Sequence, residues 1–565
     1  MIENSKHTGI FLSENDNVGC AKNNTAAIKR IAIVGGGITG WTVAAGLANG
    51  LRGLNIEIAL IDNPAQIEID LHTEATTPAC VAFHRALGIS ELDLVMKTGA
   101  SFLLATEFNA WSSAQQHYFM PFVDHGFMLN RIEFSQYTIS HHLGGKPFHF
   151  NSYDDYALAS VAAKAGRFCH PSAQSSSLFS TLDYGLALNT NAYAEYLSAF
   201  AVPMGVAHIQ AQTDGAVVDE SGNIKAIRLG SVDSTVNRNI NSLWIDESGL
   251  LAADLFIDCS GITAALIEKT LQVEWLPLAN VTPVSGKSPV TQVASSLQPL
   301  GADAAIPVAR QLQPAAAGWI QTCTTQTHVG KNYFYHADFA NDEQISVALN
   351  ADLSAVKIHP LRTGRRATFW QNNCIAIGQA ASNPDQLAAG KLHLVQSAVL
   401  RLLSLFPAQA DAVFNRVEYN RLTHLELDHI DDFHALHYQL AAVTDSDYWQ
   451  SIARAQLSDR LLHKLELFKT RGLIPHYENE TFSSGIWTSL LLGNGFWPQR
   501  CDPLVRTMDQ VWINQNLEKM KTMMASAAGA MPMQADYLQA AREKMQLSGG
   551  EMKTGKNIKV GYAVA

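Results

Sequence analysis

The chain has 565 residues, of which 47% are apolar and 16% charged, and this composition indicates a globular protein with more than one core. A net charge of −11 without a cluster of Lys and Arg argues against a nucleic-acid-binding protein. Because no apolar run reaches eighteen residues, we expect no membrane span.

The cysteines and the first residues indicate the cellular compartment of the protein. All seven cysteines stand singly and form no C-x-x-C pair, which favours reduced thiols in the cytoplasm over a disulfide framework or a zinc site. Residues 1–27 are polar and lack the apolar region of a signal peptide. We therefore expect a cytoplasmic protein without a metal, in which residues 1–28 form a flexible extension.

The first predicted unit is a strand, a glycine turn and a helix. Residues 31–34 are apolar, and apolar residues then recur at helical spacing over 43–51. The turn reads G-x-G-x-x-G from Gly35, and glycine there allows a tight turn, close approach to a pyrophosphate and helix-to-strand packing. A second strand at 56–61 ends in Asp62, where a ribose hydroxyl would need an acidic partner. This context favours a dinucleotide site over a purely structural glycine turn.

The middle of the chain alternates between helical and strand patterns. We expect helices and strands in the following order: a helix at 79–87, a strand at 100–108, a helix at 191–200, a strand at 205–212 and a hairpin at 216–228. An aromatic and histidine-rich insert, about 112–180, interrupts this series, and we interpret it as a substrate lid or wall.

The second half begins with strands and ends with helices. The apolar strands at 253–261 and 374–378 both end in glycine, and we expect the first to return to the nucleotide sheet. Residues 272–318 suit a second sheet. The helical period then dominates over 387–516, and a weaker helix is expected at 533–547.

Taken in order, several short motifs resemble those of the flavin-dependent tryptophan halogenase family from residue 30 to residue 503. They are Gly35-Gly-Gly-Ile-Thr-Gly-Trp41, Glu74-Ala-Thr76, Ala100-Ser-Phe102, Tyr118-Phe-Met-Pro-Phe122, Asp254-Leu-Phe-Ile-Asp-Cys-Ser-Gly261, Gly318-Trp319, Gly364-Arg-Arg366, Ala376-Ile-Gly378, Asp432-Phe433, Leu436-His-Tyr438, Asp447 with Trp449, Leu490-Leu-Leu-Gly493 and Asp502-Pro503. Each motif alone is ordinary, but their order and spacing are specific.

The resemblance implies an α/β fold and a division of the chain. A glutathione-reductase-like FAD-binding domain, with a Rossmann-type βαβ unit, would be interleaved with a mixed β-sheet over 29–386. A largely helical substrate-binding module would follow at 387–548, and a flexible tail at 549–565.

The resemblance also implies a cofactor and a partner. FAD would bind non-covalently, and a separate NAD(P)H-dependent flavin reductase would deliver it in reduced form. The residues expected to contact FAD are Gly35, Gly37, Thr39, Gly40, Asp62, Glu74 and Gly378. The substrate would be an indole or related aromatic group, and its expected contacts are Phe496, Trp497 and Trp449. A homodimer is one of the oligomeric states left open.

The chain departs from the family pattern at the residues of halogen chemistry. Leu103 stands where the family has the lysine that receives the oxidised halide, and Ala388 stands where it has a glutamate beside the substrate. The Trp-x-Trp-x-Ile-Pro signature survives only as Trp319. Lys97 lies six residues before the lysine position, and Lys391 is the better placed, though weak, substitute. No catalytic residue can therefore be assigned from the sequence.

Three functions remain open. The first is an oxygen-using monooxygenase or oxidase that acts on an indole, tryptophan or related aromatic group. The second is a genuine halogenase with a relocated lysine. The third is a non-catalytic homologue that binds an aromatic or peptide ligand.

Four histidines near residue 430 resemble a metal cluster at first sight. Their spacing does not put all four on one helix face, so we interpret His424, His429, His434 and His437 as core or surface residues.

Overall fold

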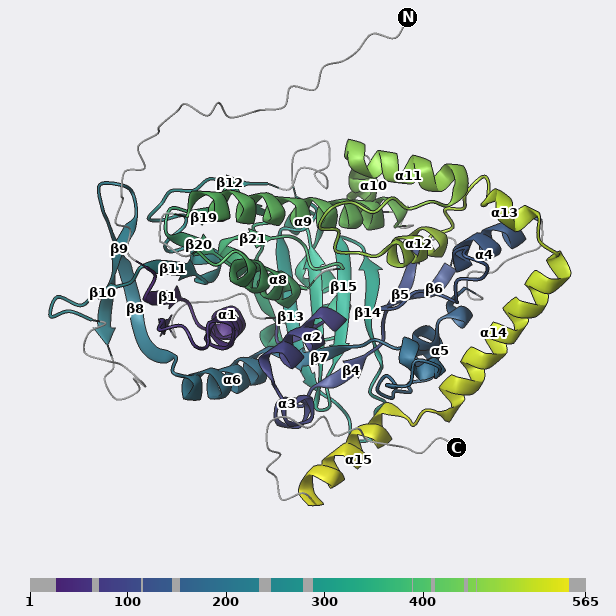
Figure 1. Ribbon diagram of the computed structural model, residues 1–565, viewed down its shortest axis with the longest axis horizontal. Coiled ribbons are helices and arrows are strands. Elements are labelled where there is room, and N and C mark those ends of the chain that lie inside the picture. Colours follow the sequence, from purple (N-terminus) through teal and green to yellow (C-terminus); the bar gives the residue numbers. More distant parts are fainter. Residues whose placement is uncertain are drawn as a thin grey trace, which may run out of the picture.

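A computed structural model of the chain describes residues 27–63, 71–112, 115–144, 153–232, 245–277, 288–388, 390–407, 412–441, 446–453 and 455–547 (Figure 1). The tail expected at 549–565 and nearly all of the expected extension at 1–28 lie outside these ranges. So do residues 145–152 of the aromatic insert, and Ala389.

The nucleotide unit is built on parallel strands from distant parts of the chain. β1 (Arg30–Val34) pairs in parallel with β2 (Glu57–Asp62) and with β11 (Leu255–Asp258), which in turn pairs with β20 (Cys374–Ala376). The predicted strands at 56–61, 253–261 and 374–378 are thereby confirmed. The eight-stranded sheet has the order β10-β9-β8-β2-β1-β11-β20-β19, completed by β8 (Ala207–Val218), β9 (Ile224–Val232), β10 (Leu250–Ala252) and β19 (Trp370–Gln371).

Helices from both halves of the chain cover this sheet. α1 (Gly37–Gly50), α6 (Thr190–Ala201) and α8 (Lys391–Ser404) share one apolar core. A Cβ atom on Gly46 of α1 would lie only 2.5 Å from a methyl group of Val399 on α8. The first helix of the C-terminal helical region therefore packs directly onto the nucleotide unit.

A second, mixed sheet lies beside the first near the middle of the molecule (Figure 1). Its order is β17-β13-β16-β15-β14-β5-β6, with bounds β5 (Ala105–Ser112), β6 (Gln115–Pro121), β13 (Gln292–Pro299), β14 (Ala309–Ala315), β15 (Gly318–Thr324), β16 (His328–Tyr335) and β17 (Lys357–Pro360). Two smaller sheets join β3 (Thr73–Ala75), β7 (Gly185–Asn189) and β4 (Ser101–Leu103), and β12 (Trp275–Leu276), β18 (Gly364–Arg366) and β21 (Ser382–Asn383).

The single strand predicted at 100–108 is two strands in two sheets. β4 pairs with β7, whereas β5 pairs with β14 and β6, and Leu104 lies between them. The Leu104 N–H donates to the carbonyl of Val308 at 2.7 Å. Because residues 101–106 are buried throughout, the sequence carries no alternation that would reveal the break.

The remaining helices surround these sheets. Their bounds are α2 (Pro78–Leu87), α3 (Glu91–Thr98), α4 (Phe134–Leu143), α5 (Leu158–Lys164), α7 (Asp342–Leu349), α9 (Val413–Leu440), α10 (Asp447–Ile452), α11 (Asp459–Arg471), α12 (Ser484–Gly493), α13 (Pro503–Arg506), α14 (Gln510–Ala530) and α15 (Gln534–Leu547). The predicted helices at 79–87, 191–200 and 533–547 are confirmed.

The last two helices run along one edge of the molecule and back beneath the sheets (Figure 1). Gln534 of α15 accepts a hydrogen bond from the backbone N–H of Phe102 at 2.7 Å. The end of the chain thus holds the strand that contains position 103.

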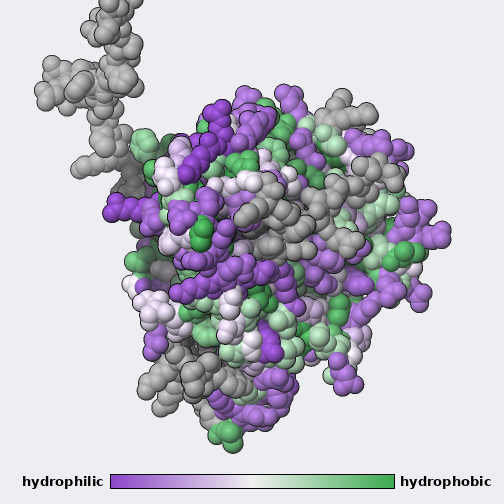
Figure 2. Space-filling model, turned by 90° about the vertical axis from the view of Figure 1, so that its right-hand side faces the viewer, coloured by the Kyte–Doolittle hydropathy of each residue, from purple (hydrophilic) through white to green (hydrophobic). Residues whose placement is uncertain are grey.

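Polar and apolar residues intermix on the face shown in Figure 2. None of the described helices is both long and apolar enough to cross a bilayer.

Candidate functional site

The glycine turn between β1 and α1 is closed by backbone contacts. Gly35 has a φ of +109°, and a Cβ atom on it would lie 2.3 Å from the carbonyl oxygen of Cys259. A Cβ on Gly40 would lie 1.9 Å from the Gly35 carbonyl oxygen. Both positions therefore exclude any larger residue, as the predicted dinucleotide turn requires.

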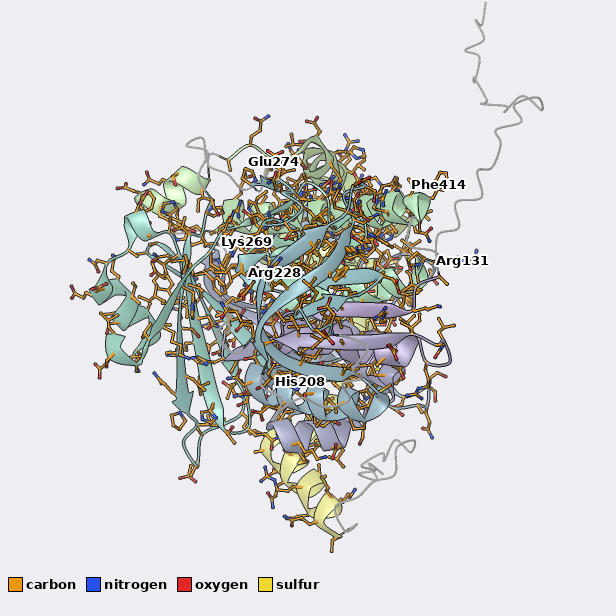
Figure 3. All side chains as sticks on the ribbon, turned by 90° about the vertical axis from the view of Figure 1, so that its left-hand side faces the viewer. Arg131, His208, Arg228, Lys269, Glu274 and Phe414 are labelled. Atoms are coloured by element: carbon orange, nitrogen blue, oxygen red, sulfur yellow. The ribbon has the colours of Figure 1, made fainter. Side chains whose placement is uncertain are left out.

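The start of α1 suits a phosphate group. Gly37 begins the helix, its first turn has no acidic residue, and the N-cap Gly36 makes no side-chain cap hydrogen bond. Backbone N–H groups at such a helix end favour an anion. A Cβ on Gly36 would lie 2.2 Å from the Asp62 carboxylate, so Asp62 lies over the turn. His208 lies beside it on β8 (Figure 3). Its Nε2 is 3.5 Å from Oδ2 of Asp62.

Gly378 joins the same turn from β20. Its φ is +69°, and a Cβ on it would lie 2.7 Å from the Thr39 methyl group in the first turn of α1. The structure thus brings together Gly35, Gly37, Thr39, Gly40, Asp62 and Gly378. These residues fit the pyrophosphate and ribose of a dinucleotide, although contact with FAD itself stays a prediction.

Glu74 lies at the other end of this region, at the start of α8. Its Oε1 accepts the Leu392 N–H at 3.3 Å, and a Cβ on the N-cap Gly390 would lie 2.3 Å from the same oxygen. The Glu74 carboxylate therefore stabilises the positive end of α8. Its expected contact with FAD remains a prediction.

Lys391, the weak candidate for a relocated lysine, lies on the nucleotide side of α8. It lines a cavity of about 20 Å³ together with Gly378, Gln379, Asn383 and Gln386. Gln379 is buried, and neither its amide nitrogen nor its amide oxygen has a partner in the described part of the chain.

Position 103 lies in apolar surroundings. Leu103 is 1% exposed and packs with Ala75, Ala187 and Cys323. Cys323 is fully buried on β15, and burial raises the pKa of its thiol to about 12. Neither side chain can therefore act as the basic amine that the family lysine provides.

Position 388 is held by its backbone. The Ala388 N–H donates to His434 Nε2 at 3.2 Å, and its carbonyl accepts from Arg310 Nη2 at 3.1 Å. His434 Nδ1 lies 2.8 Å from Asp385 Oδ1, and both side chains are almost fully buried. Since Nε2 accepts the hydrogen bond from the Ala388 N–H, Nδ1 carries the hydrogen of the neutral ring and faces Asp385.

Polar contacts connect the buried pair of His434 and Asp385 to Trp319, the surviving tryptophan of the altered signature. Tyr438, one helical turn after His434 on α9, lies close enough to the Asp385 carboxylate to lower its pKa. The Tyr438 hydroxyl also accepts from Trp319 Nε1 at 3.0 Å. Burial alone would raise the pKa of Asp385, but the contacts with His434, the Leu387 N–H and Tyr438 lower it below its ordinary value. The loop before Ala388 is therefore held by a chain of polar contacts.

Sequence reasoning did not find this network. Neither Arg310 nor Asp385 was predicted as a site residue, and His434 was interpreted as an ordinary core or surface residue. The spacing of His434 and Tyr438 is the one available signal, because residues four apart share a helix face.

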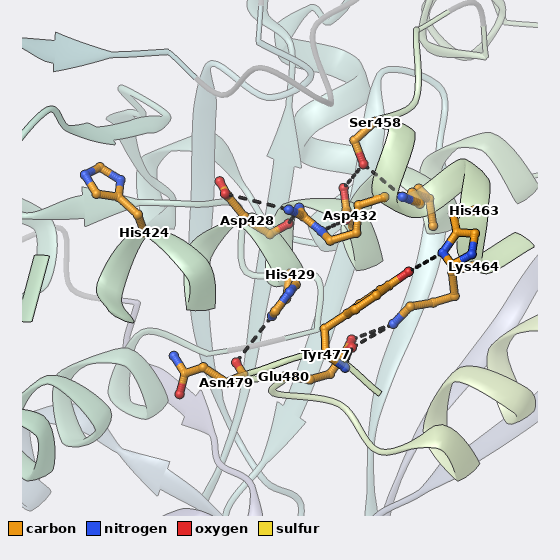
Figure 4. Close-up of polar contacts among 12 residues, drawn as sticks. His424, Asp428, His429, Asp432, Ser458, His463, Lys464, Tyr477, Asn479 and Glu480 are labelled. Atoms are coloured by element: carbon orange, nitrogen blue, oxygen red, sulfur yellow. Dashed lines mark hydrogen bonds and ion pairs between the residues drawn. The ribbon is translucent and has the colours of Figure 1, made fainter. Parts of the chain in front are cut away.

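The four histidines of α9 have separate partners rather than a common ligand. His424 Nε2 contacts the Ala367 carbonyl at 3.2 Å, and His429 Nδ1 contacts the Asn479 carbonyl at 3.3 Å (Figure 4). His437 Nδ1 contacts the Phe433 carbonyl at 2.9 Å. Within the described ranges, no three His, Cys, Asp or Glu side chains come together in a way that could hold a metal ion.

A buried ion pair lies near these histidines. Lys464 Nζ lies 2.7 Å from Glu480 Oε1 (Figure 4). The same oxygen accepts from Trp487 Nε1 at 2.8 Å. The Lys464 ammonium lies 4.0 Å from the centre of the Trp487 ring. This cluster therefore links α11 to α12 through Lys464 and Trp487, with both ions paired.

The three aromatic residues expected to contact substrate lie in different surroundings. Trp449 is 2% exposed, and its Nε1 donates to the Ala315 carbonyl at 2.8 Å. Trp497 stacks on His142 of α4 with ring centres 3.8 Å apart, and the Phe496 ring lies 6.2 Å from that of Phe468. Their role in substrate binding stays a prediction.

A second aromatic group surrounds His437, three residues after His434 on α9. The rings of Phe108 and Tyr118 stack at 4.6 Å, and Phe108 also stacks on His437 at 5.2 Å. His437 is fully buried, and burial lowers its pKa to about 3. Its Nδ1 contacts a carbonyl, whereas its Nε2 has no hydrogen-bond partner in the described residues. His437 is therefore a neutral acceptor.

Comparison with known proteins places this geometry in context. The sequence profile of the tryptophan halogenase family matches residues 30–510. Tryptophan 6-halogenase SttH of Streptomyces toxytricini is 24% identical, over 92% of this chain and 100% of that protein. Tryptophan 7-halogenase RebH of Lentzea aerocolonigenes is 24% identical, over 78% of this chain and 82% of that protein.

Solved structures agree with the sequence comparison. BrvH, a flavin-dependent halogenase from Brevundimonas sp. BAL3, superposes with a TM-score of 0.82 at 26% identity, over 91% of this chain and 99% of that one. Xcc4156, a flavin-dependent halogenase from Xanthomonas campestris, has a TM-score of 0.81 at 27% identity, with the same coverage. The expected α/β fold is thereby confirmed, and the chain belongs to the tryptophan halogenase family.

Proposed function

We propose that this protein is an FAD-dependent oxidoreductase that uses oxygen to modify an indole or related aromatic group without a halogen-carrying lysine. The observation that carries the proposal is the pair of replacements at Leu103 and Ala388. Both residues are buried, and Leu103 packs among apolar side chains. No amine at position 103 can receive a halide, and no carboxylate at position 388 can assist the substitution.

FAD is the cofactor, and the closed glycine turn on the nucleotide side supports this role. The first turn of α1 would hold the pyrophosphate, and Asp62 would hold the ribose. Bound reduced FAD would supply the electrons that activate dioxygen. The sequence holds one G-x-G-x-x-G turn, so we expect a separate NAD(P)H-dependent reductase to deliver the reduced flavin.

His437 supports an aromatic substrate that carries an N–H group. Its Nε2 is an unpartnered acceptor among the described residues, and its ring stacks on Phe108. A buried acceptor without a donor is costly, and an indole N–H would relieve that cost. We expect Trp449, Phe496 and Trp497 to contribute further contacts. We keep the cytoplasm as the expected compartment, a proposal supported by six free cysteines.

A halogenase with a relocated lysine is the second candidate. The observation in its favour is that Lys391 shares a cavity with Gly378 on the nucleotide side. A non-catalytic homologue that binds an aromatic or peptide ligand is the third.

One reaction separates these candidates. The purified protein is mixed with reduced FAD, oxygen and a panel of indoles and tryptophan-containing peptides, with and without bromide, and products are read by mass spectrometry. We expect one added oxygen mass, or substrate-dependent hydrogen peroxide, that is independent of bromide. A bromine isotope pair would overturn this proposal.

Lys391→Met is the matched variant for that reaction. Under the proposed function, it leaves the oxygen product unchanged, because Lys391 has no role there. Bromination by the wild type that is lost in Lys391→Met would establish the relocated-lysine halogenase. Flavin binding without any product or peroxide would favour the binding homologue.

A further inference from the structure

A large cavity lies along α8, apart from the small cavity that contains Lys391. Its volume is about 380 Å³, which is in the range of small-molecule sites. The lining side chains that concern binding are four polar ones and two apolar ones: His393, Gln396, Ser397 and Arg401, with Leu400 and Leu422. The two cavities share no lining residue, so the larger one is a separate space.

The charges at the large cavity are balanced within the protein. Arg401 Nη2 lies 2.6 Å from Glu426 Oε2, and Arg401 Nη1 donates to the Thr423 hydroxyl at 2.8 Å. Burial lowers the pKa of His393; the Glu426 carboxylate opposes this shift, and Arg401 adds to it. The His393 ring is therefore neutral at neutral pH. A ligand in this cavity is favoured when it carries no net charge, because no opposite charge is left to pair with it.

Two polar side chains in the cavity lack hydrogen bonds. Neither ring nitrogen of His393 has a hydrogen-bond partner among the described residues, although its Nε2 lies 3.7 Å from Glu426 Oε1. A hydrogen on Nε2 faces that carboxylate, which leaves Nδ1 as an acceptor. Gln396 is 2% exposed, and its Nε2 donates to Cys80 Sγ at 3.2 Å. Its Oε1 accepts from no residue in the described part of the chain.

Ser397 contributes a donor beside these two acceptors. Its hydroxyl accepts from Arg401 Nη2 at 3.2 Å, and its own hydrogen has no acceptor within the described ranges. His393, Gln396 and Ser397 occupy positions i, i+3 and i+4 of α8, so they share one helix face. Two acceptors and one donor on one face complement a primary carboxamide, whose NH₂ group donates twice and whose oxygen accepts.

We propose that this cavity binds a small, uncharged aromatic carboxamide through His393, Gln396 and Ser397. The amide would supply the donors that the two buried acceptors lack. Leu400 and Leu422 provide apolar surface for the ring, and Leu400 is 48% exposed, so the cavity is open to the surface there. This site is separate from the nucleotide turn and from the aromatic group around His437, and the proposal does not depend on the proposed reaction.

Binding of 4-fluorobenzamide to the FAD-loaded, full-length protein provides the test. The ¹⁹F line width is measured as protein is added, and nicotinamide is then added as an unlabelled competitor. We expect wild type to broaden the line and nicotinamide to narrow it again. The isosteric 4-fluorobenzoate should bind roughly tenfold more weakly, because its carboxylate brings a charge and no donor to the two acceptors.

Two variants locate the site. Ser397→Ala removes the donor, Gln396→Met removes one acceptor, and each should weaken the amide affinity by roughly three- to tenfold. Ser397 is only half-buried, so its variant provides the test even if Gln396→Met does not fold. His437→Phe is the control for the other aromatic site and should leave the affinity unchanged.

Three results would overturn the proposal. The first is a line that wild type does not broaden, or broadens equally for the amide and the carboxylate. The second is an affinity that is equal in wild type and Ser397→Ala, or that falls in His437→Phe instead. The third comes from wild-type crystals soaked in 4-bromobenzamide, which need no variant: anomalous bromine peaks elsewhere with none beside Ser397 exclude the site.

Discussion

The glycine turn at α1 and the polar network around Ala388 differ in how far their residues can be substituted. At Gly35 and Gly40 the backbone of another residue lies where a side chain would have to be, so no substitution is tolerated. Around Ala388, by contrast, side chains from β14, α9 and the loop itself hold the backbone in place. The glycine turn therefore depends on backbone geometry that cannot vary, whereas the surroundings of Ala388 depend on side chains, which can be exchanged.

The largest effect is expected at the turn. Gly37→Asp places a carboxylate at the start of α1, where the pyrophosphate would lie, and forces a non-glycine residue to a φ of +64°. We expect FAD affinity to fall at least a hundredfold, and the protein to purify without the 450 nm absorbance of bound flavin.

Gly53→Asp is the control for that change. Gly53 also has a positive φ, +93°, but a Cβ there meets nothing within 4 Å. A protein with Gly53→Asp should remain yellow. Equal flavin content in the two variants would show that the turn is not part of the FAD site.

The second largest effect is expected from a substitution in the polar network around Ala388. Asp385→Ala leaves the buried Nδ1–H of neutral His434 without its partner, so we expect a loss of about 1–3 kcal/mol of unfolding free energy. Urea denaturation measures it. The double variant Asp385→Leu with His434→Phe removes both polar groups and should recover part of the loss. No recovery would mean that the pair does not act as a unit.

Acidification should destabilise the fold through two buried histidines. Burial lowers the pKa of His84 to about 4 and that of His437 to about 3. Because the unfolded chain binds these protons at its ordinary pKa of about 6.5, stability is complete above that pH and declines as the pH falls towards 4, by about 3 kcal/mol for each histidine. Urea midpoints between pH 7 and pH 4 measure the decline.

The variant His437→Phe tests how much of the loss of stability at low pH is due to His437. Phenylalanine keeps an aromatic ring against Phe108 but does not titrate. The decline between pH 6.5 and pH 4 should then become shallower by about half. If the loss of stability between pH 6.5 and pH 4 is unchanged in this variant, it is due to titratable groups other than His437.

The smallest effect is expected at Lys97. Its side chain is 61% exposed on α3, and its Nζ lies 3.0 Å from Asp93. Lys97→Met should change the unfolding free energy by less than about 0.5 kcal/mol, because exposed ion pairs contribute little. Flavin content should not change. A loss of product formation in this variant would place Lys97 in the site after all.

The sequence predicted the nucleotide unit well because its signals are local. A strand, a glycine turn and a helix occupy neighbouring residues, and Asp62 follows at a fixed spacing. The break at Leu104 was missed, since residues on both sides of it are buried and no alternation marks the change of sheet. Arg310 was missed for another reason. Its partners Thr106 and Ala388 are 204 and 78 residues away, so no pattern near residue 310 announces them.

The hydrogen bond between Gln534 and Phe102 has a consequence for synthesis on the ribosome. The two residues are 432 positions apart, so at about 5–20 residues per second the strand that contains position 103 waits on the order of 20–90 s for its partner. During that time β4 has a free backbone N–H, which is a point of attachment for other strands. Nascent chains should therefore be most prone to aggregation in that interval, and shortening the chain before residue 534 should make the exposure permanent.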